Sequence, residues 1–360
     1  MQLLGQSRLQ YMSMSFDYMS LKKFDLIRSV VAHKLIGDMQ KSVEERLNLR
    51  IANITDLTRS VKSFELTNEL GGGLPSFDAG AHVEVTLPPS LKRHYSICND
   101  STERHRYVIA VLRQDNGAGG SKYMHEKLRV GDRIEASMPR NNFPLVGGPK
   151  RFILIAGGIG ITPILPMISE LQARNGEFAL HYCAKSRDEA AFVDLLEARC
   201  NANQLATHFD GGDPSKGLNV SLLLSEYHVG THVYCCGPSG LMQAVRAATV
   251  AWPDDAVHFE YFAPMDAGNT GSDAEAFDVI IRSRSLSLKV PPDKTIVQVL
   301  RENGIEVETS CEAGTCGTCR CRYLAGQPIH NDYVLTTREK GKYVMICCAR
   351  ARGEPLILDL

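Results

Sequence analysis

The ten residues Ser310–Cys319, SCEAGTCGTC, decide what the last part of this chain can be. Their three cysteines are separated by four and then by two residues, and a fourth cysteine, Cys347, follows well downstream. Gly314 and Gly317 lie between the cysteines, and glycine lets a backbone turn tightly. The pattern therefore predicts a loop in which several thiols converge on one point.

A [2Fe–2S] cluster fits this spacing better than the other roles of a cysteine group. Plant-type ferredoxins hold two irons with C-x4-C-x2-C and a distant fourth cysteine, and backbone N–H groups directed at the sulfurs reduce their negative charge. Structural zinc sites usually pair two short C-x2-C knuckles, whereas the first gap here is four residues long. A disulfide is the remaining alternative. The predicted cluster ligands are Cys311, Cys316, Cys319 and Cys347.

Two neighbouring cysteines make the choice of ligands ambiguous. Cys348 directly follows Cys347, and Cys321 lies two residues after Cys319. Cys347 has the better spacing for the fourth ligand. We therefore expect Cys348 and Cys321 to be buried and to act as small apolar residues.

Length and composition are those of a globular protein of two or three domains. The 360 residues carry 40 basic and 41 acidic side chains, a net charge of -1, which gives no reason to expect a nucleic-acid partner. Thiolate ligands need reducing surroundings, so we expect a cytoplasmic protein, and we expect a monomer. No window approaches the roughly 18 consecutive apolar residues of a membrane-spanning helix, and the N-terminus does not match an export signal.

Residues 1–45 differ from the pattern that follows and are predicted to be a helical N-terminal extension. Apolar side chains recur there at near-helical spacing, which is typical of one amphipathic helix, and they are Leu26, Ile27, Val30, Val31 and Leu35. The helix is expected to pack on the first domain or to belong to an upstream extension. Docking on a partner or on a membrane surface is the alternative.

Between residues 46 and 148, short stretches alternate apolar and polar residues, and turns rich in Gly, Pro and Asp separate them. Leu47–Ile54, His82–Leu87 and Tyr107–Leu112 are examples, and together they predict a small antiparallel β-barrel. Near its end, the glycine-rich turn Asn116–Ser121 leads into a predicted helix at Lys122–Lys127. Such a turn presents free backbone N–H groups to a phosphate.

From residue 149 to 265, strands alternate with helices, which predicts a parallel α/β sheet. The strands are Arg151–Ala156, Phe178–Ala184, His232–Cys236 and Val257–Phe262. The first runs into the turn Gly157–Pro163, and the third runs into Cys236–Gly240. Ligands of open α/β sheets bind at the carboxyl ends of the strands, so these two turns form the candidate nucleotide site.

Residues 266–276 are rich in Gly, Asp, Asn and Ser and are predicted to be a linker. Beyond them, residues 277–360 are predicted to form an α+β domain around the cysteine loop. Phe277–Ile281 and Leu286–Val290 are expected to form a hairpin, and Ile296–Glu302 a helix. This order of elements is that of a plant-type ferredoxin.

The stretch Arg93-His94-Tyr95-Ser96 resembles the Arg-x-Tyr-Ser strand of the flavin-binding domain in the ferredoxin-reductase superfamily. The resemblance implies that this strand binds the flavin: Tyr95 lies against its ring, Ser96 hydrogen-bonds near its reactive nitrogen, and Arg93 holds its phosphate. A second element looks like the one found in FMN-binding members, whereas FAD-binding relatives carry a different Gly-x-x-Ser element. It consists of Gly119, Gly120, Ser121 and His125.

Further motifs are similar to those of the nicotinamide domain in the same superfamily. The resemblance implies nucleotide contacts by a Gly-x-Gly-x-Thr-Pro turn, by residues at the adenosine ribose and by a Cys-Gly-Pro turn beside the nicotinamide. These residues are Gly158, Gly160, Thr162, Pro163, Ser186, Arg187, Cys236, Gly237 and Pro238. The last strand resembles a Phe-Glu-x-Phe ending, which implies that Phe262 reaches the flavin face, with Tyr261 as the alternative.

The order of flavin barrel, nicotinamide domain and ferredoxin over about residues 46–360 resembles the phthalate dioxygenase reductase and vanillate demethylase reductase family. The resemblance implies an NADH-dependent oxidoreductase that passes electrons through FMN and a [2Fe–2S] cluster to a Rieske-type terminal oxygenase. Ser96, Cys236 and Phe262 are then the expected catalytic residues. An FAD-containing reductase and a plain electron carrier are the alternatives, and the basic residues Lys185 and Arg187 keep NADPH open as the donor.

Overall fold

The computed structural model describes residues 46–89, 91–117, 119–148, 151–262, 275–309, 312–315, 317–332, 334–335 and 337–360. The helix predicted within residues 1–45 lies outside these ranges, as do residues 266–274 of the predicted linker. Cys311 and Cys316, two of the four predicted cluster ligands, also lie outside them.

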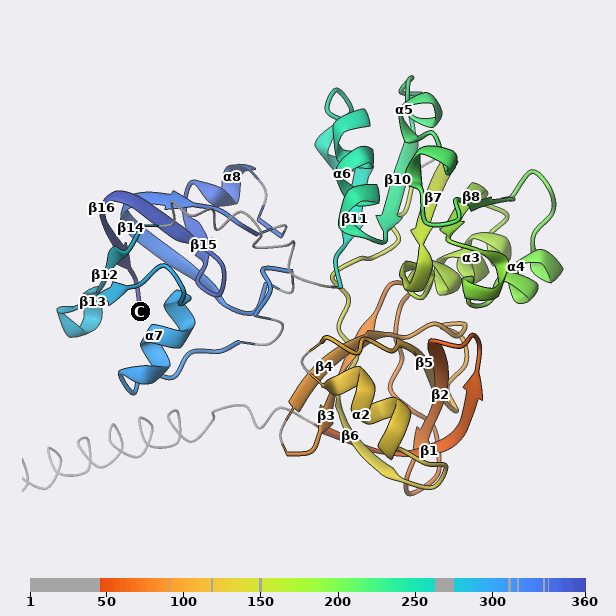
Figure 1. Cartoon of the computed structure of the whole chain (residues 1–360), viewed down its shortest axis with the longest axis horizontal. Coiled ribbons are helices and arrows are strands. Elements are labelled where there is room, and N and C mark those ends of the chain that lie inside the picture. The colour runs from red at the N-terminus through yellow and green to blue at the C-terminus, as the bar shows by residue number, and fades with distance from the viewer. Residues whose placement is uncertain are drawn as a thin grey trace, which may run out of the picture. The chain divides into compact units, whose positions relative to one another are not determined.

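A six-stranded antiparallel sheet comes first along the chain, and its elements are β1 (Arg46–Asp56), β2 (Val61–Asn68), β3 (His82–Leu87), β4 (Leu91–Ser96), β5 (Tyr107–Leu112) and β6 (Arg133–Ser137), with the helix α2 (Gly120–Lys127). The strand order is β4-β3-β6-β1-β2-β5 (Figure 1). A bridge between Ile97, just after β4, and Ile109 of β5 joins the two ends of this order, so the sheet nearly closes into a barrel. Alternate side chains fill its interior, among them the fully buried Phe64, Val83 and Tyr107.

The second sheet is parallel, and its strands are β7 (Arg151–Gly157), β8 (Glu177–Ala184), β9 (Leu205–Phe209), β10 (Thr231–Cys236) and β11 (Val257–Glu260). Their order is β11-β10-β7-β8-β9. The helices are α3 (Ile164–Ala173), α4 (Val193–Arg199), α5 (Val220–Leu223) and α6 (Ser239–Ala248). Single 3-10 turns are η1 (Gly158–Ile161), η2 (Arg187–Glu189), η3 (Pro214–Lys216) and η4 (Asp254–Ala256).

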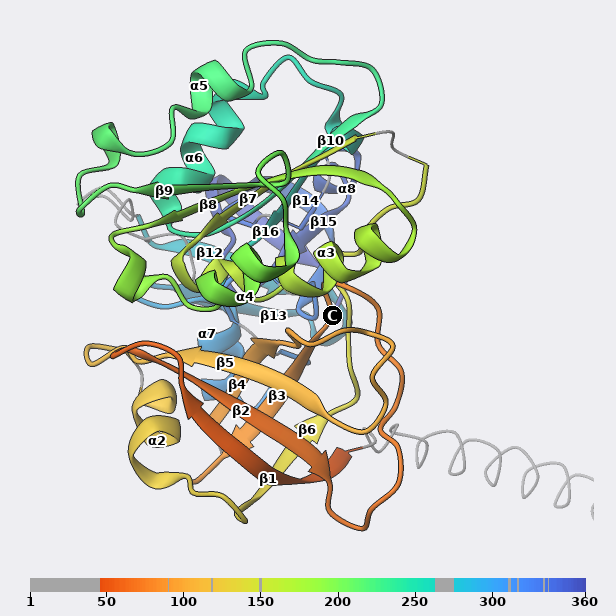
Figure 2. The same cartoon turned by 90° about the vertical axis from the view of Figure 1, so that its right-hand side faces the viewer.

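Helices cover both faces of the parallel sheet, with α3 and α4 on one face and α5 and α6 on the other (Figure 2). Phe152 and Leu154 of β7 pack in the core that includes α3 and α4, whereas Ile153 and Ile155 pack in the core that includes α5 and α6. This two-sided burial explains why β7 is a continuous apolar run.

The third sheet mixes parallel and antiparallel pairs, and its elements are β12 (Phe277–Ile281), β13 (Leu286–Val290), β14 (Arg320–Ile329), β15 (Tyr343–Met345) and β16 (Arg350–Leu358), with α7 (Ile296–Glu302), α8 (Thr337–Lys340) and the 3-10 turn η6 (Arg282–Arg284). The order is β13-β12-β16-β14-β15, so the last strand of the chain lies in the middle. A capping box of Thr295 and Gln298 begins α7, which buries Val297 and Leu300 in the core of this sheet.

The predicted fold class is confirmed, because a nearly closed antiparallel barrel, a parallel α/β sheet and an α+β unit follow one another along the chain. The bounds of β3, β5, β12, β13 and α7 are those that the sequence predicts. The last parallel strand is shorter than predicted: its partner β10 ends at Cys236, so β11 ends at Glu260 and leaves Tyr261 and Phe262 outside the sheet. Among the described residues, no helix is long and apolar enough to cross a membrane.

Candidate functional site

The turns that follow β7 and β10 pack directly on one another at the carboxyl edge of the parallel sheet. A Cβ atom at Gly160 would lie 2.1 Å from the carbonyl oxygen of Cys236, and one at Gly157 would lie 2.5 Å from Cδ of Pro238. Because no other residue leaves room for this approach, both glycines are required here. The two predicted nucleotide motifs therefore meet at one place.

The turn after β7 is stabilised by a buried hydrogen bond, and the space beside Gly158 is open. Thr162 is buried, and its hydroxyl donates a hydrogen bond to the carbonyl oxygen of Ile159 at 3.0 Å. Pro163 is the N-cap of α3. A Cβ atom at Gly158 would meet nothing within 4 Å among the described residues. A nucleotide can therefore approach the backbone at this turn.

A serine from the barrel and two residues of the parallel sheet meet beside these turns. Oγ of Ser96, the last residue of β4, lies 3.5 Å from Oε2 of Glu260. Glu260 ends β11 and is paired in register with Cys236, the last residue of β10. Two residues predicted to be catalytic, Ser96 and Cys236, are thus gathered around one carboxyl group.

Glu260 is the site residue that the sequence analysis missed. Desolvation raises its pKa to about 8, although the hydrogen bond with Ser96 acts in the opposite direction. The carboxyl group therefore holds a proton at neutral pH and can donate a hydrogen bond. Burial also raises the pKa of the Cys236 thiol well above its usual value, so this side chain stays protonated. The sequence does contain a signal for Glu260: a carboxylate near the end of a predicted parallel strand lies at the sheet edge where ligands bind.

Arg93 crosses the N-terminus of α2, where the glycine-rich turn ends. A Cβ atom at Gly120 would lie 2.8 Å from both Cγ and Nε of Arg93. Gly119 has φ +82°, and within the described residues no side chain caps the helix. A guanidinium beside uncapped helical N–H groups is a combination that suits a phosphate.

The remaining residues of the predicted flavin strand divide between its two sides. Tyr95 packs against the barrel core, and desolvation raises its pKa to about 12. Nε2 of His94 lies 3.6 Å from the carboxylate of Glu84, and its ring lies 5.1 Å from that of His82. His94 therefore faces groups of its own domain.

The hydroxyl and imidazole of the predicted phosphate element both contact the backbone of the barrel. Oγ of Ser121 accepts a hydrogen bond from the N–H of Gln114 at 3.1 Å, so its own proton remains to be donated. His125 is buried, with Nε2 2.8 Å from the carbonyl oxygen of Val111, and desolvation lowers its pKa. The role of His125 in phosphate binding stays a prediction.

The predicted ribose residues follow β8 at the same edge of the sheet. Ser186 is half-buried and precedes η2. Arg187 is paired with two carboxylates of α4: its Nη2 donates to Oε2 of Glu197 at 2.8 Å, and it also donates to Asp194. The guanidinium predicted to lie at the ribose is therefore already neutralised.

The two aromatic residues after β11 differ in their contacts. The side chain of Phe262 is 48% exposed. The hydroxyl of Tyr261 accepts a hydrogen bond from Nη2 of Arg246 at 2.7 Å. Phe262 is thus the more exposed of the two, and its contact with a flavin ring stays a prediction.

The described cysteines of the cluster loop fit an iron–sulfur site. Cys319 and Cys347 are almost fully buried, and the thiol of Cys347 lies within hydrogen-bonding reach of both Cys319 and Cys348. Gly314 has φ +71°, and a Cβ atom there would lie 2.7 Å from Sγ of Cys348. Cys321 is buried as expected, whereas Cys348 is only partly buried. Two soft thiol donors side by side under a tight loop are suitable ligands for a cluster.

Two domain families match the sequence. Residues 154–247 match the oxidoreductase NAD-binding domain, and residues 279–352 match the 2Fe-2S iron-sulfur cluster binding domain. The chain is 46% identical to the tert-butanol monooxygenase / tert-amyl alcohol desaturase reductase subunit of Aquincola tertiaricarbonis. The matched region covers 87% of this chain and 96% of that protein. It is 46% identical to the vanillate O-demethylase oxidoreductase of Pseudomonas sp. (84% of this chain, 96% of that protein). It is 42% identical to the phthalate dioxygenase reductase of Burkholderia cepacia (87% and 97%).

The chain belongs to the phthalate dioxygenase reductase and vanillate O-demethylase reductase family. A solved structure entitled phthalate dioxygenase reductase, "a modular structure for electron transfer from pyridine nucleotides to [2Fe-2S]", is similar with a TM-score of 0.67 and 41% identity, covering 88% of this chain and 98% of that one. The predicted family, its enzyme class as an oxidoreductase, and its NAD-binding and [2Fe–2S] domains are thereby confirmed.

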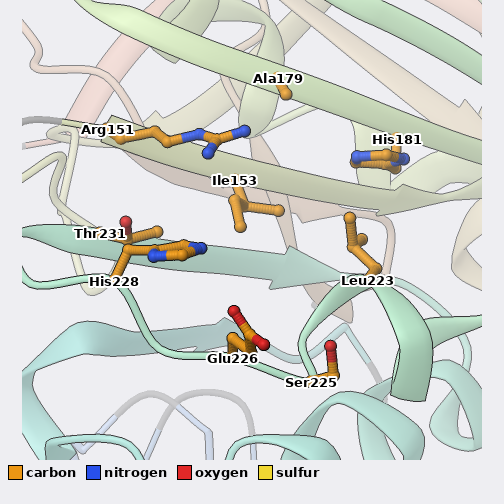
Figure 3. A pocket seen from close by; sticks show the side chains of 9 residues that line it. All are labelled: Arg151, Ile153, Ala179, His181, Leu223, Ser225, Glu226, His228 and Thr231. Carbon is orange, nitrogen blue, oxygen red and sulfur yellow. The ribbon is translucent and has the colours of Figure 1, made fainter.

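In this reductase a cavity of about 160 Å³ lies away from the two nucleotide turns (Figure 3). Arg151 and Thr231, the first residues of β7 and β10, line its wall with His181 of β8. Ser225 and Glu226 line the opposite side, and His228 lies beside Thr231. The carboxyl ends of these strands, where the motifs meet, take no part in it.

Proposed function

We propose that this chain is the reductase component of an oxygenase system and passes electrons from NADH through FMN and a [2Fe–2S] cluster to a Rieske-type oxygenase. The observation that carries the proposal is the meeting of Ser96, Cys236 and Glu260 beside the packed turns after β7 and β10. The relatives support it, because they are named as reductases of a tert-butanol monooxygenase, a vanillate O-demethylase and a phthalate dioxygenase.

The residues of the site bind and orient, and the bound cofactors supply the redox chemistry. A flavin accepts two electrons together and releases them singly, whereas a [2Fe–2S] centre takes one. The turns around Gly160 and Cys236 hold the nicotinamide end of the nucleotide at the sheet edge. Ser96 and the protonated carboxyl of Glu260 form a polar pair that can move a proton at Oε2. Phe262 is exposed enough to lie on a ring face.

FMN rather than FAD is the flavin that we propose, because a terminal phosphate suits the site between Arg93 and the N-terminus of α2. Ser121 has a proton to donate to the same phosphate. Denaturing the purified protein and identifying the released flavin by chromatography tests this assignment: we expect FMN. FAD in the supernatant would refute it and would leave the electron path intact.

A matched pair of variants tests the phosphate site itself. Arg93→Ala should weaken flavin binding by about one to two decades, because a charge-assisted contact to phosphate is worth roughly 1.5–3 kcal/mol. Arg104→Ala, which removes a cation of the same barrel that donates to the carbonyl oxygen of Leu74, should leave flavin affinity unchanged. Equal losses in the two variants would contradict the assignment.

NADH rather than NADPH is the donor that we propose. A 2′-phosphate needs a free cation near the ribose, and Arg187 is paired with Asp194 and Glu197. Residues 185–197 contain two cations, Lys185 and Arg187, and four carboxylates, so their net charge is negative and repels an added phosphate. Steady-state reduction of an artificial acceptor with each nucleotide tests the donor, and a kcat/KM that favours NADPH would refute it.

The type of oxygenase is the part of the proposal that most needs an experiment. Phthalate and vanillate relatives support a Rieske-type partner, but an intact type IV self-sufficient cytochrome P450 monooxygenase also matches, with a TM-score of 0.75 and 34% identity over 88% of this chain and 41% of that one. Co-purification with the tagged chain, followed by an absorption spectrum, separates the two. We expect a Rieske spectrum without haem. A haem Soret band would refute the Rieske-type partner. If the holoprotein does not oxidise NADH, the chain is a plain electron carrier and not a reductase.

We also propose the domain boundaries predicted from the sequence: an extension at 1–45, an FMN barrel at 46–148, a nicotinamide domain at 149–265, a linker at 266–276 and a ferredoxin domain at 277–360. The strands of the three sheets support them, since each sheet falls within one of these ranges. A cytoplasmic location follows from the need of thiolate ligands for reducing surroundings. Light scattering of the holoprotein tests the proposed monomer.

A further inference from the structure

The loop that leads into β14 contains three described residues in the left-handed region, and only one of them has a side chain. Gly314 and Gly317 have φ +71° and +79°, whereas Glu312 has φ +49°. A residue with a Cβ atom is strained in this conformation, and glycine is not. A carboxylate at this position therefore needs a compensating contact.

Glu312 has such a contact, with the end of α7. Nη2 of Arg301 lies 2.6 Å from Oε1 of Glu312, and the same guanidinium donates to the hydroxyl of Thr309. That hydroxyl donates to Oε1 of Glu312 at 2.9 Å. Arg301, Thr309 and Glu312 thus form one connected group of charge-assisted contacts.

The position of this contact in the sequence gives it a specific meaning. Thr309 precedes and Glu312 follows Ser310-Cys311, and Cys311 is the first predicted cluster ligand. One guanidinium therefore contacts the described residue on either side of Ser310-Cys311 in the sequence. The helix from which it extends begins with a capping box and is packed in the core, which makes it a firm support.

We propose that Arg301 is a positioning residue for the [2Fe–2S] cluster: with Thr309 and Glu312 it anchors the segment around Cys311, and the charges of Arg301 and Glu312 balance each other in setting the reduction potential. The proposal rests on the cluster of the proposed function and on neither the flavin nor the nucleotide. Reduction adds one negative charge to the cluster. A nearby cation favours that step and a nearby carboxylate opposes it.

The proposal predicts that two variants change the rate of cluster loss in the same direction and the reduction potential in opposite directions. Arg301→Gln and Glu312→Gln both break the anchor, so both should lose the cluster to a chelator roughly two- to fivefold faster, as expected for an ion pair worth up to about 1 kcal/mol. Their reduction potentials should move in opposite directions. Arg301→Gln leaves an unbalanced carboxylate and lowers the potential, whereas Glu312→Gln leaves an unbalanced cation and raises it.

The experiment uses the purified holoprotein at low ionic strength, where charge effects are screened least. EPR-monitored redox titration gives the potential, and the fall of cluster absorbance in EDTA gives the loss rate. Lys294→Gln is the matched control, because the pair of Lys294 and Glu302 flanks the same helix with similar exposure: 38% and 53%, against 38% and 41% for Arg301 and Glu312. The control should change neither quantity.

Two further variants separate anchoring from backbone strain and from charge. Glu312→Gly relieves the left-handed conformation but removes the anchor, so the cluster should still be lost faster than in the wild type. Arg301→Lys keeps the charge, so the potential should stay close to that of the wild type. Shifts of the same sign in the two Gln variants, or a Glu312→Gly protein that keeps its cluster as long as the wild type, would overturn the proposal. A wild-type chain that holds no cluster would overturn the proposed function as well.

Discussion

At the turn after β7 a glycine is required because another backbone lies against it, whereas in the loop before β14 a glycine is required because of its conformation. A Cβ atom at Gly160 would lie 2.1 Å from the carbonyl oxygen of Cys236. Gly317 has φ +79°, and nothing described lies within 4 Å of its Cβ position. The nucleotide edge is thus built by backbone packing between neighbouring strands, and the cluster loop by conformation and by individual side chains.

This difference teaches where each site is vulnerable. The nucleotide edge should resist most side-chain changes and fail when volume is added between the turns, because its backbone is fixed by the register of a parallel sheet. The cluster loop should fail when a left-handed glycine is replaced, or when one thiol or one anchoring contact is removed.

The largest expected effect is the loss of the cluster from a single thiol change. Cys347→Ser should remove the iron and the cluster absorbance completely, because a hydroxyl does not replace a buried thiolate beside Cys319. NADH should still reduce the flavin, since that step precedes the cluster. Iron analysis and stopped-flow absorbance measure both quantities.

Cys348→Ser is the control for that change and should retain about two irons per chain. Cys348 is only partly buried, and its Sγ lies near Gly314, so it is the other thiol that the fold brings to the loop. If the Cys348 variant alone loses the cluster, the assignment of the fourth ligand is wrong.

The next largest effect should come from added volume at the nucleotide edge. Gly160→Ala forces the turns after β7 and β10 apart, and overpacking of this kind typically costs about 1–3 kcal/mol. We expect a lower Tm and a raised KM for NADH. Gly240→Ala is the control for Tm alone, because Gly240 belongs to the second nucleotide turn: it lies in α6 with nothing described within 4 Å, so alanine should stabilise the helix slightly. A Gly160 variant that is as stable as the Gly240 variant would break the comparison.

A smaller effect should appear in the pH dependence of stability. The pKa of Glu260 is about 8 in the folded protein against an ordinary value of 4.5, so between these values the folded state binds a proton that the unfolded state has released. Its contribution to stability is therefore present at low pH and is lost as pH rises through 8, on the order of a few kcal/mol. Glu260→Gln does not titrate.

Thermal unfolding of the wild type and of Glu260→Gln between pH 5 and 9 tests this sign. The variant should gain stability relative to the wild type as the pH rises. A difference that is constant with pH would show that Glu260 is already ionised at neutral pH.

The smallest expected effect concerns the choice of nucleotide. Asp194→Asn with Glu197→Gln releases Arg187, and NADPH should then gain a few-fold in kcat/KM, while NADH changes little because ribose hydroxyls need no cation. Adding Arg187→Ala should abolish the gain. If the gain survives without Arg187, removal of negative charge is the whole cause, and the guanidinium has no part in nucleotide choice.

Much of the architecture could be predicted because it follows from local periodicity and turn residues. The strands β3, β5, β12 and β13 have alternating or continuous apolar patterns, and their predicted bounds are confirmed. The meeting of Gly157–Pro163 with Cys236–Pro238 could be predicted as well, because the carboxyl ends of parallel strands share one edge.

What could not be predicted depends on partners from distant parts of the chain. The raised pKa of Glu260 follows from its partial burial beside Ser96, which comes from another sheet. Whether Arg187 faces a nucleotide or α4 depends on the orientation of a loop, which sequence does not give. The contact of Arg301 with Glu312 likewise depends on where α7 ends relative to the loop. The roles of Cys311 and Cys316 stay predictions.

The central place of β16 determines the order in which a cell can complete this protein. Arg350–Leu358 is translated after the other four strands of its sheet, and it pairs with both β12 and β14. While the ribosomal exit tunnel still encloses it, the sheet lacks its middle strand, and Cys347, three residues earlier, has no fixed position. The barrel and the parallel sheet, which are translated first, can fold during synthesis. Cluster insertion is therefore a step that follows the translation of β16, so a shortage of iron would leave chains with folded nucleotide domains and no cluster to accept electrons from the flavin.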